Sequence, residues 1–266
     1  MTDFAFIDSG VGGIPYMMEL LNKQSEASCI YVADTANFPY GPKTHEEVVN
    51  CVLPLVEKII NRFEPRVIVL ACNTISVNAL ELLRKKFPDT EFVGTVPAIK
   101  LAAGVSKKRR LGLIASKATC ENPYNQELKN KFASDCELIC RPDGDLISFI
   151  EKNAFTATPE ECLKAVQSAV DFFRRNDCDV IILGCTHFLN FADIFKQACG
   201  KDIAVVDSVD GVVRQMIKVW GGAEMSVALR HAQGPILYIT SAQNADEQKK
   251  YELICSHFNI HFCGNI

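Results

Sequence analysis

Two short segments of the chain each place a cysteine directly after an apolar run. Residues 67–74 read Val-Ile-Val-Leu-Ala-Cys-Asn-Thr, and residues 180–187 read Val-Ile-Ile-Leu-Gly-Cys-Thr-His. Runs rich in β-branched residues are typical of strands that are buried on both faces. Ligands bind at the carboxyl ends of such strands in open α/β sheets, so we expect the thiols of Cys72 and Cys185 to take part in chemistry.

Two kinds of chemistry are compatible with these thiols, because helix N-termini favour the thiolate, the reactive form of cysteine. A cysteine hydrolase needs one thiol and a histidine base, and His187 lies two residues after Cys185, on the same side of a strand. That chemistry leaves Cys72 without a role. Racemisation uses both thiols, since one group removes a proton from a stereocentre and the other returns a proton to the opposite face. Asp8 could then tune Cys72, and His187 could tune Cys185.

The order of the predicted elements indicates an α/β protein made of two similar halves. The spacing from the first cysteine to the end of the next strand, Cys72 to Gly94, is the same as that from Cys185 to Asp207. We predict two pseudo-symmetric lobes, each a mostly parallel sheet flanked by helices, with the active site in the cleft between them. The first lobe is expected to comprise residues 1–97 and 210–266, and the second residues 98–209.

Individual elements follow from apolar periodicity and capping signals. Thr44 and Glu47 form a capping box that predicts where one helix begins. The predicted strands cover residues 4–7, 30–33, 67–70, 91–93, 111–115, 137–140, 180–183, 203–206 and 235–240. One predicted helix follows the first strand and ends at residue 21. The other predicted helices cover residues 44–62, 75–86, 146–153, 159–175 and 245–258.

Composition excludes several classes of function. The chain has 266 residues, with 28 basic and 32 acidic side chains and a net charge of −4, so nothing in it recruits nucleic acid or an anionic membrane surface. No apolar run approaches the roughly 18 residues of a membrane span, and the first residues lack the basic start of a signal peptide. We therefore expect a cytoplasmic protein, in which most of the 12 cysteines are reduced and serve in packing.

Three further features have simple structural interpretations. The glycine-rich turn at residues 8–13 could hold a carboxylate or phosphate, or Asp8 could only cap the turn. Its glycine spacing differs from the dinucleotide-binding fingerprint. The basic run at residues 107–110 is expected to be the solvated start of a strand. Four cysteines and histidines lie near the C-terminus: Cys255, His257, His261 and Cys263. His257 and His261 have the i, i+4 spacing of helical metal ligands, but no other pair has zinc-ribbon spacing, so we expect a polar strand or helix end and no metal there.

Several segments, in order and at matching spacing, resemble the glutamate racemases of the cofactor-independent aspartate/glutamate racemase superfamily. The segments are residues 6–13, 31–34, 39–41 with Lys43, 71–74, 94–100 and 183–188. The resemblance implies an isomerase that interconverts L- and D-glutamate without a cofactor or metal, as a homodimer, and that supplies D-glutamate for peptidoglycan synthesis, cell wall biogenesis and cell shape.

The resemblance also implies roles for individual residues. The catalytic set that it implies is Cys72, Cys185, Asp8, His187 and Glu151. The substrate-binding set that it implies is Asp8, Ser9, Tyr40, Gly41, Asn73, Thr74, Thr119, Thr186 and His187.

Three alternatives remain open from the residues alone. A racemase of the same superfamily could act on aspartate or another amino acid, since one methylene changes specificity only about 10–200-fold. An amidohydrolase would use Cys185 and His187 alone. A two-lobed amino-acid binding module would bind glutamate without exchanging its α-proton. No signature of pyridoxal phosphate binding is evident.

Overall fold

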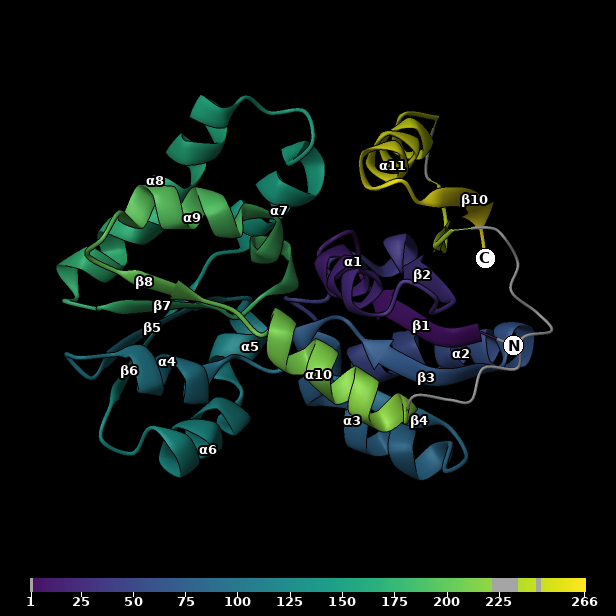
Figure 1. Ribbon diagram of the computed structural model, residues 1–266, viewed down its shortest axis with the longest axis horizontal. Coiled ribbons are helices and arrows are strands. Elements are labelled where there is room, and N and C mark those ends of the chain that lie inside the picture. Colours follow the sequence, from purple (N-terminus) through teal and green to yellow (C-terminus); the bar gives the residue numbers. More distant parts are fainter. Residues whose placement is uncertain (1, 222–233, 243–244) are drawn as a thin grey trace. The chain divides into compact units, whose positions relative to one another are not determined.

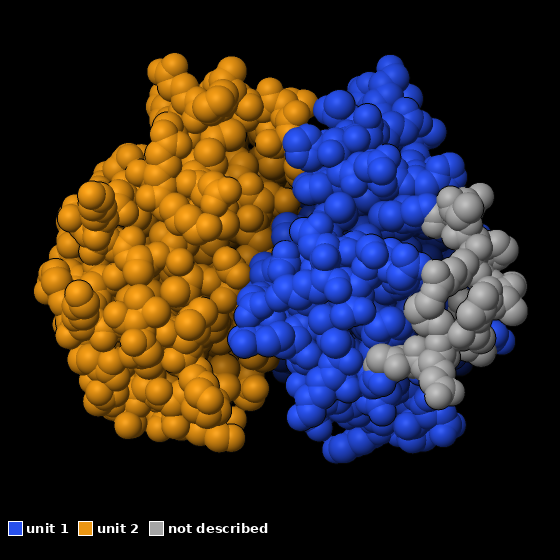
Figure 2. All heavy atoms as spheres, in the orientation of Figure 1, with its two compact units in different colours: residues 1–95, 209–266 blue, residues 96–208 orange. Residues whose placement is uncertain are grey.

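The chain forms two compact α/β units in the computed structural model, which describes residues 2–221, 234–242 and 245–266. Unit 1 comprises Met1–Thr95 and Val209–Ile266, and unit 2 comprises Val96–Ser208 (Figure 2). Each unit contains one parallel sheet flanked by helices (Figure 1). This architecture is the predicted fold class. Among the described residues, no helix combines the length and the apolar composition needed to cross a bilayer.

The sheet of unit 1 has six strands in the order β10-β9-β2-β1-β3-β4, and all its pairs are parallel. Phe6 in the central strand pairs with Tyr31 on one side and Val69 on the other. The C-terminal strand and helix predicted from the sequence belong to this unit, where β9 pairs with β2. The strands are β1 (Thr2–Asp8), β2 (Cys29–Ala33), β3 (Pro65–Leu70), β4 (Glu91–Gly94), β9 (Ile236–Ile239) and β10 (His261–Asn265).

Helices cover both faces of this sheet. Alternate residues of β1 point to opposite faces and therefore pack against different helices. Ala5 and Ile7 pack in the core beneath α2 and α3, whereas the Phe4 ring lies 5.5 Å from the ring of Trp220 in α10. The predicted capping box starts α2, where the Glu47 N–H donates to Thr44 Oγ1. The helices are α1 (Ile14–Lys23), η1 (Thr35–Asn37), α2 (His45–Phe63), α3 (Asn73–Lys86), α10 (Val209–Trp220) and α11 (Ala245–Phe258).

The sheet of unit 2 has four parallel strands in the order β6-β5-β7-β8. A Cβ atom at Gly112 would lie 2.4 Å from the Phe173 ring, so glycine is required for the close packing of β5 and α8. The strands are β5 (Arg110–Ala115), β6 (Glu137–Pro142), β7 (Val180–Leu183) and β8 (Ala204–Val206). The helices are α4 (Ile99–Val105), α5 (Lys117–Glu121), α6 (Pro123–Phe132), α7 (Gly144–Asn153), α8 (Pro159–Arg175), η2 (Thr186–Phe191) and α9 (Ala192–Cys199).

The C-terminal cysteines and histidines are spread over α11 and β10. Cys255 is buried in α11, and Cys263 is exposed in β10. Within the described ranges, no group of three or more histidine, cysteine, aspartate or glutamate side chains is arranged to hold a metal ion.

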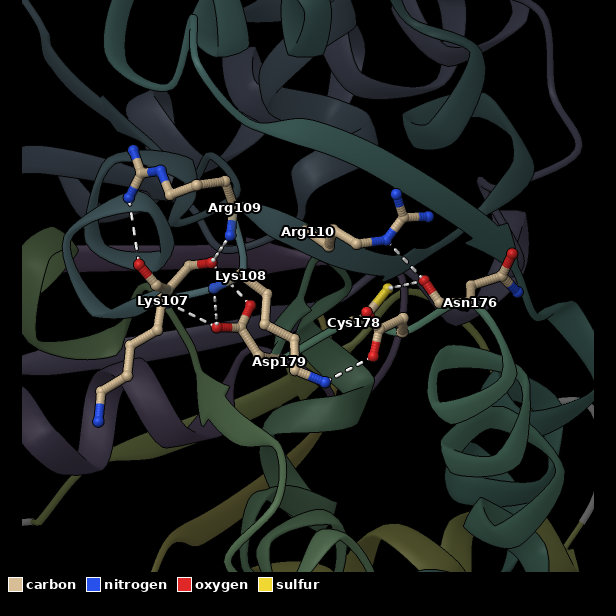
Figure 3. Close-up of polar contacts among 9 residues, drawn as sticks. Lys107, Lys108, Arg109, Arg110, Asn176, Cys178 and Asp179 are labelled. Carbon is tan, nitrogen blue, oxygen red and sulfur yellow. Dashed lines mark hydrogen bonds and ion pairs between the residues drawn. The ribbon is translucent and has the colours of Figure 1, made fainter.

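The basic run at residues 107–110 is fastened to the start of β7 by one carboxylate (Figure 3). Asp179 Oδ2 accepts from the backbone N–H groups of Lys107 and Lys108 at 2.6 and 2.8 Å, and its Oδ1 accepts from the Ser106 hydroxyl at 2.7 Å. Partial burial raises the pKa of Asp179, but these hydrogen bonds outweigh burial and hold the pKa below its ordinary value. The run is thus a structural turn at the start of β5, and its hydrogen bonds to Asp179 tie it to the start of the neighbouring strand β7.

Replacing Asp179 by asparagine is expected to lower the free energy of unfolding by about 1–2 kcal/mol at pH 7, because an ionised acceptor is lost. A carboxylate with a depressed pKa stabilises the fold above its unfolded-state pKa of about 3.9, and that contribution disappears as pH falls through the folded-state pKa. Urea unfolding at pH 7 and at about pH 3, below the unfolded-state pKa, measures both effects, and the difference between Asp179→Asn and the wild type should shrink at the lower pH.

Asp177→Asn is the matched control on the same turn. Asp177 pairs with Lys108 Nζ at 2.5 Å, but both side chains are exposed, so the expected loss is below about 1 kcal/mol. Equal losses for the two variants would contradict the role assigned to Asp179.

Candidate active site

Asp8 fastens the turn that follows the central strand of unit 1. Its fully buried carboxylate accepts from the N–H groups of Ser9 at 2.7 Å and Gly13 at 2.8 Å. A Cβ atom at Gly13 would lie 2.5 Å from Ala71 Cβ, so only glycine lets this turn approach the end of β3. Asp8 therefore fastens its own turn, and that turn lies against Ala71, the residue that immediately precedes Cys72.

Cys72 lies between β3 and α3, at the N-cap position of the helix. Cys72 is 7% exposed, and its side chain makes no hydrogen bond that caps the helix. Asn73 and Thr74 follow as the first two residues of α3, and both are buried. The partial positive charge of the helix N-terminus therefore lies beside the thiol, where it favours a thiolate or a bound carboxylate.

Tyr40 and Gly41 lie in the loop between β2 and α2. The Tyr40 side chain is buried, and its hydroxyl donates to the carboxylate of Asp34. Burial and the neighbouring Asp34 raise the pKa of Tyr40, so it remains a phenol. The proton of the hydroxyl is thus committed to Asp34, and only the phenol oxygen remains available, as an acceptor.

In unit 2, a carboxylate, an imidazole and a thiol form a chain. His187 Nε2 lies 2.9 Å from Glu151 Oε2, and His187 Nδ1 lies 3.7 Å from Cys185 Sγ. His187 and Glu151 are only 3% and 5% exposed. Burial lowers the pKa of His187, but the hydrogen bonds to Cys185 and Glu151 more than offset burial and raise the pKa well above its ordinary value.

This arrangement suits proton transfer at the thiol. A protonated imidazole stabilises the thiolate, and Glu151 fixes the orientation of the ring. The same chain could serve a cysteine hydrolase, so the geometry of unit 2 alone does not select one reaction.

Thr119 and Thr186 are the remaining predicted residues of unit 2. Thr186 is the first residue of η2, directly after Cys185, and it is buried. Thr119 is buried in α5, where its Oγ1 accepts from the Ser116 hydroxyl at 3.0 Å. Its carbonyl accepts from the Asn125 side chain, a contact that sequence reasoning missed.

The signal for the missed contact was present in the sequence. Asn122 and Pro123 form an N-cap followed by proline at the first helical position, which marks the start of α6. Recognition of that start would have placed Asn125 in the first turn of α6, close to Thr119.

The predicted site residues thus gather at the carboxyl ends of the strands in each unit. In unit 1, the Ala71 N–H donates to the Ile7 carbonyl at 2.8 Å, and the Asp34 N–H donates to the Asp8 carbonyl at 2.7 Å, so three strand ends meet. Unit 1 contains Asp8, Ser9, Tyr40, Gly41, Cys72, Asn73 and Thr74, and unit 2 contains Thr119, Glu151, Cys185, Thr186 and His187.

The sequence and the fold were compared with known proteins. The model of the family described as Asp/Glu/Hydantoin racemase matches residues 15–216. The chain is 35% identical over 261 residues to the glutamate racemase of Treponema pallidum (strain Nichols), covering 98% of this chain and 95% of that relative. It is 34% identical over 219 residues to the glutamate racemase of Sphingopyxis alaskensis, covering 82% and 81%.

A solved structure with a similar fold is that of Escherichia coli glutamate racemase in complex with L-glutamate and the activator UDP-MurNAc-ala. It has a TM-score of 0.86 and 25% sequence identity, with 100% of this chain and 98% of that chain covered. The structure of glutamate racemase isoform RacE1 from Bacillus anthracis matches in fold with a TM-score of 0.79, at 21% identity and with coverage of 100% and 97%. The chain belongs to the Asp/Glu/Hydantoin racemase family.

Proposed function

We propose that this protein is a glutamate racemase, an isomerase that interconverts L- and D-glutamate with two thiols and without a cofactor. The observation that carries this proposal is the placement of one cysteine in each unit, each directly after a buried parallel strand. The likeness to glutamate racemases extends over nearly the full chain. A hydrolase would leave Cys72 unexplained.

The reaction needs one thiolate and one thiol on opposite sides of the α-carbon. One sulfur removes the α-proton, and the other sulfur donates its proton to the opposite face, so the two sulfurs exchange protonation states in each turnover. Asp8 assists Cys72 in this scheme. His187, oriented by Glu151, assists Cys185, because an imidazolium beside the sulfur stabilises its thiolate form.

The substrate is held by backbone N–H groups and short polar side chains. Asn73 and Thr74 open α3, where the helix N-terminus attracts a carboxylate. The same groups stabilise the negative charge that develops when the α-proton leaves. We assign substrate binding to Asp8, Ser9, Tyr40, Gly41, Asn73, Thr74, Thr119, Thr186 and His187.

We also propose a cellular role in which D-glutamate is supplied for peptidoglycan synthesis, and so for cell wall biogenesis and cell shape. The support is the family, together with an Escherichia coli relative solved with UDP-MurNAc-ala as an activator. The proposed setting is a cytoplasmic homodimer. Nucleic acid is not expected as a partner, because the net charge is −4.

Serine at either thiol position is expected to reduce racemisation in both directions by about 1000-fold or more, since each turnover requires both sulfurs. Purified protein would be incubated with L- or D-glutamate in D₂O, followed by chiral chromatography and mass spectrometry. Any residual α-deuterium exchange should be confined to one enantiomer in Cys72→Ser and to the other in Cys185→Ser, because each sulfur reaches one face of the α-carbon.

Cys263→Ser is the control, because Cys263 is an exposed free thiol of β10 that has no role in the scheme. It should racemise glutamate at the wild-type rate. A Cys72→Ser variant that keeps activity, or a wild type that binds glutamate without α-deuteration, would refute the two-thiol reaction. Comparing kcat/KM for glutamate and aspartate decides between these two substrates.

Glu151→Gln is expected to lower the pKa of His187, because the charge that stabilises the imidazolium is removed. The alkaline limb of kcat/KM should therefore move to lower pH in the direction that starts from the Cys185 thiolate. Because the His187 pKa is raised in the folded protein, its protonation stabilises the fold below about pH 6.5, and this contribution is lost as pH rises through the folded-state pKa.

Histidine NMR titration measures this pKa directly. Glu160→Gln is the matched control, since Glu160 is exposed in the first turn of α8 and should leave His187 unchanged. An unaltered His187 titration in Glu151→Gln would show that Glu151 does not support the imidazolium.

A further inference from the structure

The end of β9 meets the loop that carries Tyr40, although the two segments are about 200 residues apart in the chain. The Thr240 hydroxyl donates to Asp34 Oδ1 at 2.8 Å and accepts from the Ala36 N–H at 3.0 Å. The Thr240 N–H donates to the Ala33 carbonyl at 3.1 Å, which continues the pairing of β2 and β9 by one residue. Both hydrogen-bonding capacities of the hydroxyl, donor and acceptor, are therefore used.

Asp34 links this hydroxyl to Tyr40. Its buried carboxylate, 1% exposed, accepts from Thr240, from the phenol of Tyr40, and from Asn37 Nδ2 at 3.1 and 2.9 Å. A buried carboxylate is tolerated only where donors satisfy it, so these contacts fix its orientation. The Asp34 N–H also donates to the Asp8 carbonyl at 2.7 Å, which places the network beside the proposed catalytic acid.

Loss of the Thr240 hydroxyl would act on the loop in two ways. Asp34 Oδ1 would keep only its contact with Asn37, so the carboxylate would be free to turn away from Tyr40. The Ala36 N–H would also lose its acceptor. The polypeptide of β9 would nevertheless stay in place, because a second contact holds it: the Thr35 hydroxyl donates to the Ser241 carbonyl at 2.5 Å, and the Ser241 N–H donates back to Thr35 Oγ1 at 3.0 Å.

We propose that Thr240 is a positioning residue for substrate binding, which acts through Asp34 to hold the loop of Tyr40 and Gly41 in its binding geometry. The C-terminal segment is thereby part of the site's supporting structure. This proposal rests on the proposed function, in which Tyr40 and Gly41 contact glutamate. Thr240 itself does not touch the reacting atoms.

Thr240→Val removes the hydroxyl and keeps the volume of the side chain. We expect KM for glutamate to rise about tenfold, as loss of one hydrogen bond to a charged acceptor produces, with kcat nearly unchanged because ground-state and transition-state binding weaken equally. Thr240→Ser keeps the hydroxyl and should restore KM. Thr156→Val, on the exposed Thr156 of unit 2, is the control and should match the wild type.

A second readout is independent of activity. Amide hydrogen exchange of residues 34–43 should be faster in Thr240→Val than in the wild type, and should return to the wild-type rate in Thr240→Ser. A merely structural role would instead lower the melting temperature and the active fraction with KM unchanged, and that result would overturn the proposal. Wild-type KM and unchanged exchange in Thr240→Val would overturn it as well.

The outcome is separable from that of the proposed function. Wild-type protein that fails to racemise glutamate refutes the function, and the exchange rates of residues 34–43 in the two Thr240 variants still decide whether the hydroxyl orders the loop. A wild type that racemises glutamate, with a tenfold KM difference between Thr240→Val and Thr240→Ser, supports both.

Discussion

Parallel pairing of strands that are buried on both faces is the constraint on which each half of the site depends. β1 pairs with β2 and β3, and β5 pairs with β6 and β7. Parallel pairing brings the carboxyl ends of the strands to one edge of each sheet, where the apolar side chains stop and the polar ones begin. Asp8 and Asp34 are therefore joined by a backbone hydrogen bond, and Ala71, the residue before Cys72, is joined to Ile7, although the three strand ends come from separate segments. Close packing supports this, since Gly13 and Gly184 stand where a Cβ atom would collide with Ala71 and Leu113.

The two thiols are similar in placement and different in surroundings. Cys72 precedes an α-helix and lies near a carboxylate that is occupied with the N–H groups of its own turn. Cys185 precedes a short 3₁₀ helix and contacts an imidazole whose pKa is raised. A helix N-terminus and a buried imidazolium both favour a thiolate, but only the imidazolium carries a proton of its own. The two halves therefore present different electrostatic surroundings to their sulfur atoms.

Sequence reasoning succeeded where local patterns carry the information. Apolar runs predicted β3 and β7, and Thr44 with Glu47 predicted the start of α2. The predictions omitted α5, α6, α9 and α10. Of these, α5 and α6 bury few residues and lack a continuous apolar stripe. β10 was left undecided between strand and helix end, since its residues alternate between exposed and half-buried at the edge of the sheet.

The site was predictable only in part for the same reason. The spacing of Cys185 and His187 indicates their contact, whereas Glu151 was suggested only by family resemblance, because 36 residues separate it from His187. Nothing local indicates the contact between Asp34 and Thr240. A buried carboxylate lacking donors costs several kcal/mol, so Asp34 favours the native docking of β9 on β2, which brings the Thr240 hydroxyl to it. The loop that carries Tyr40, which follows an early strand of the chain, is thereby hydrogen-bonded to a segment about 200 residues later in the sequence.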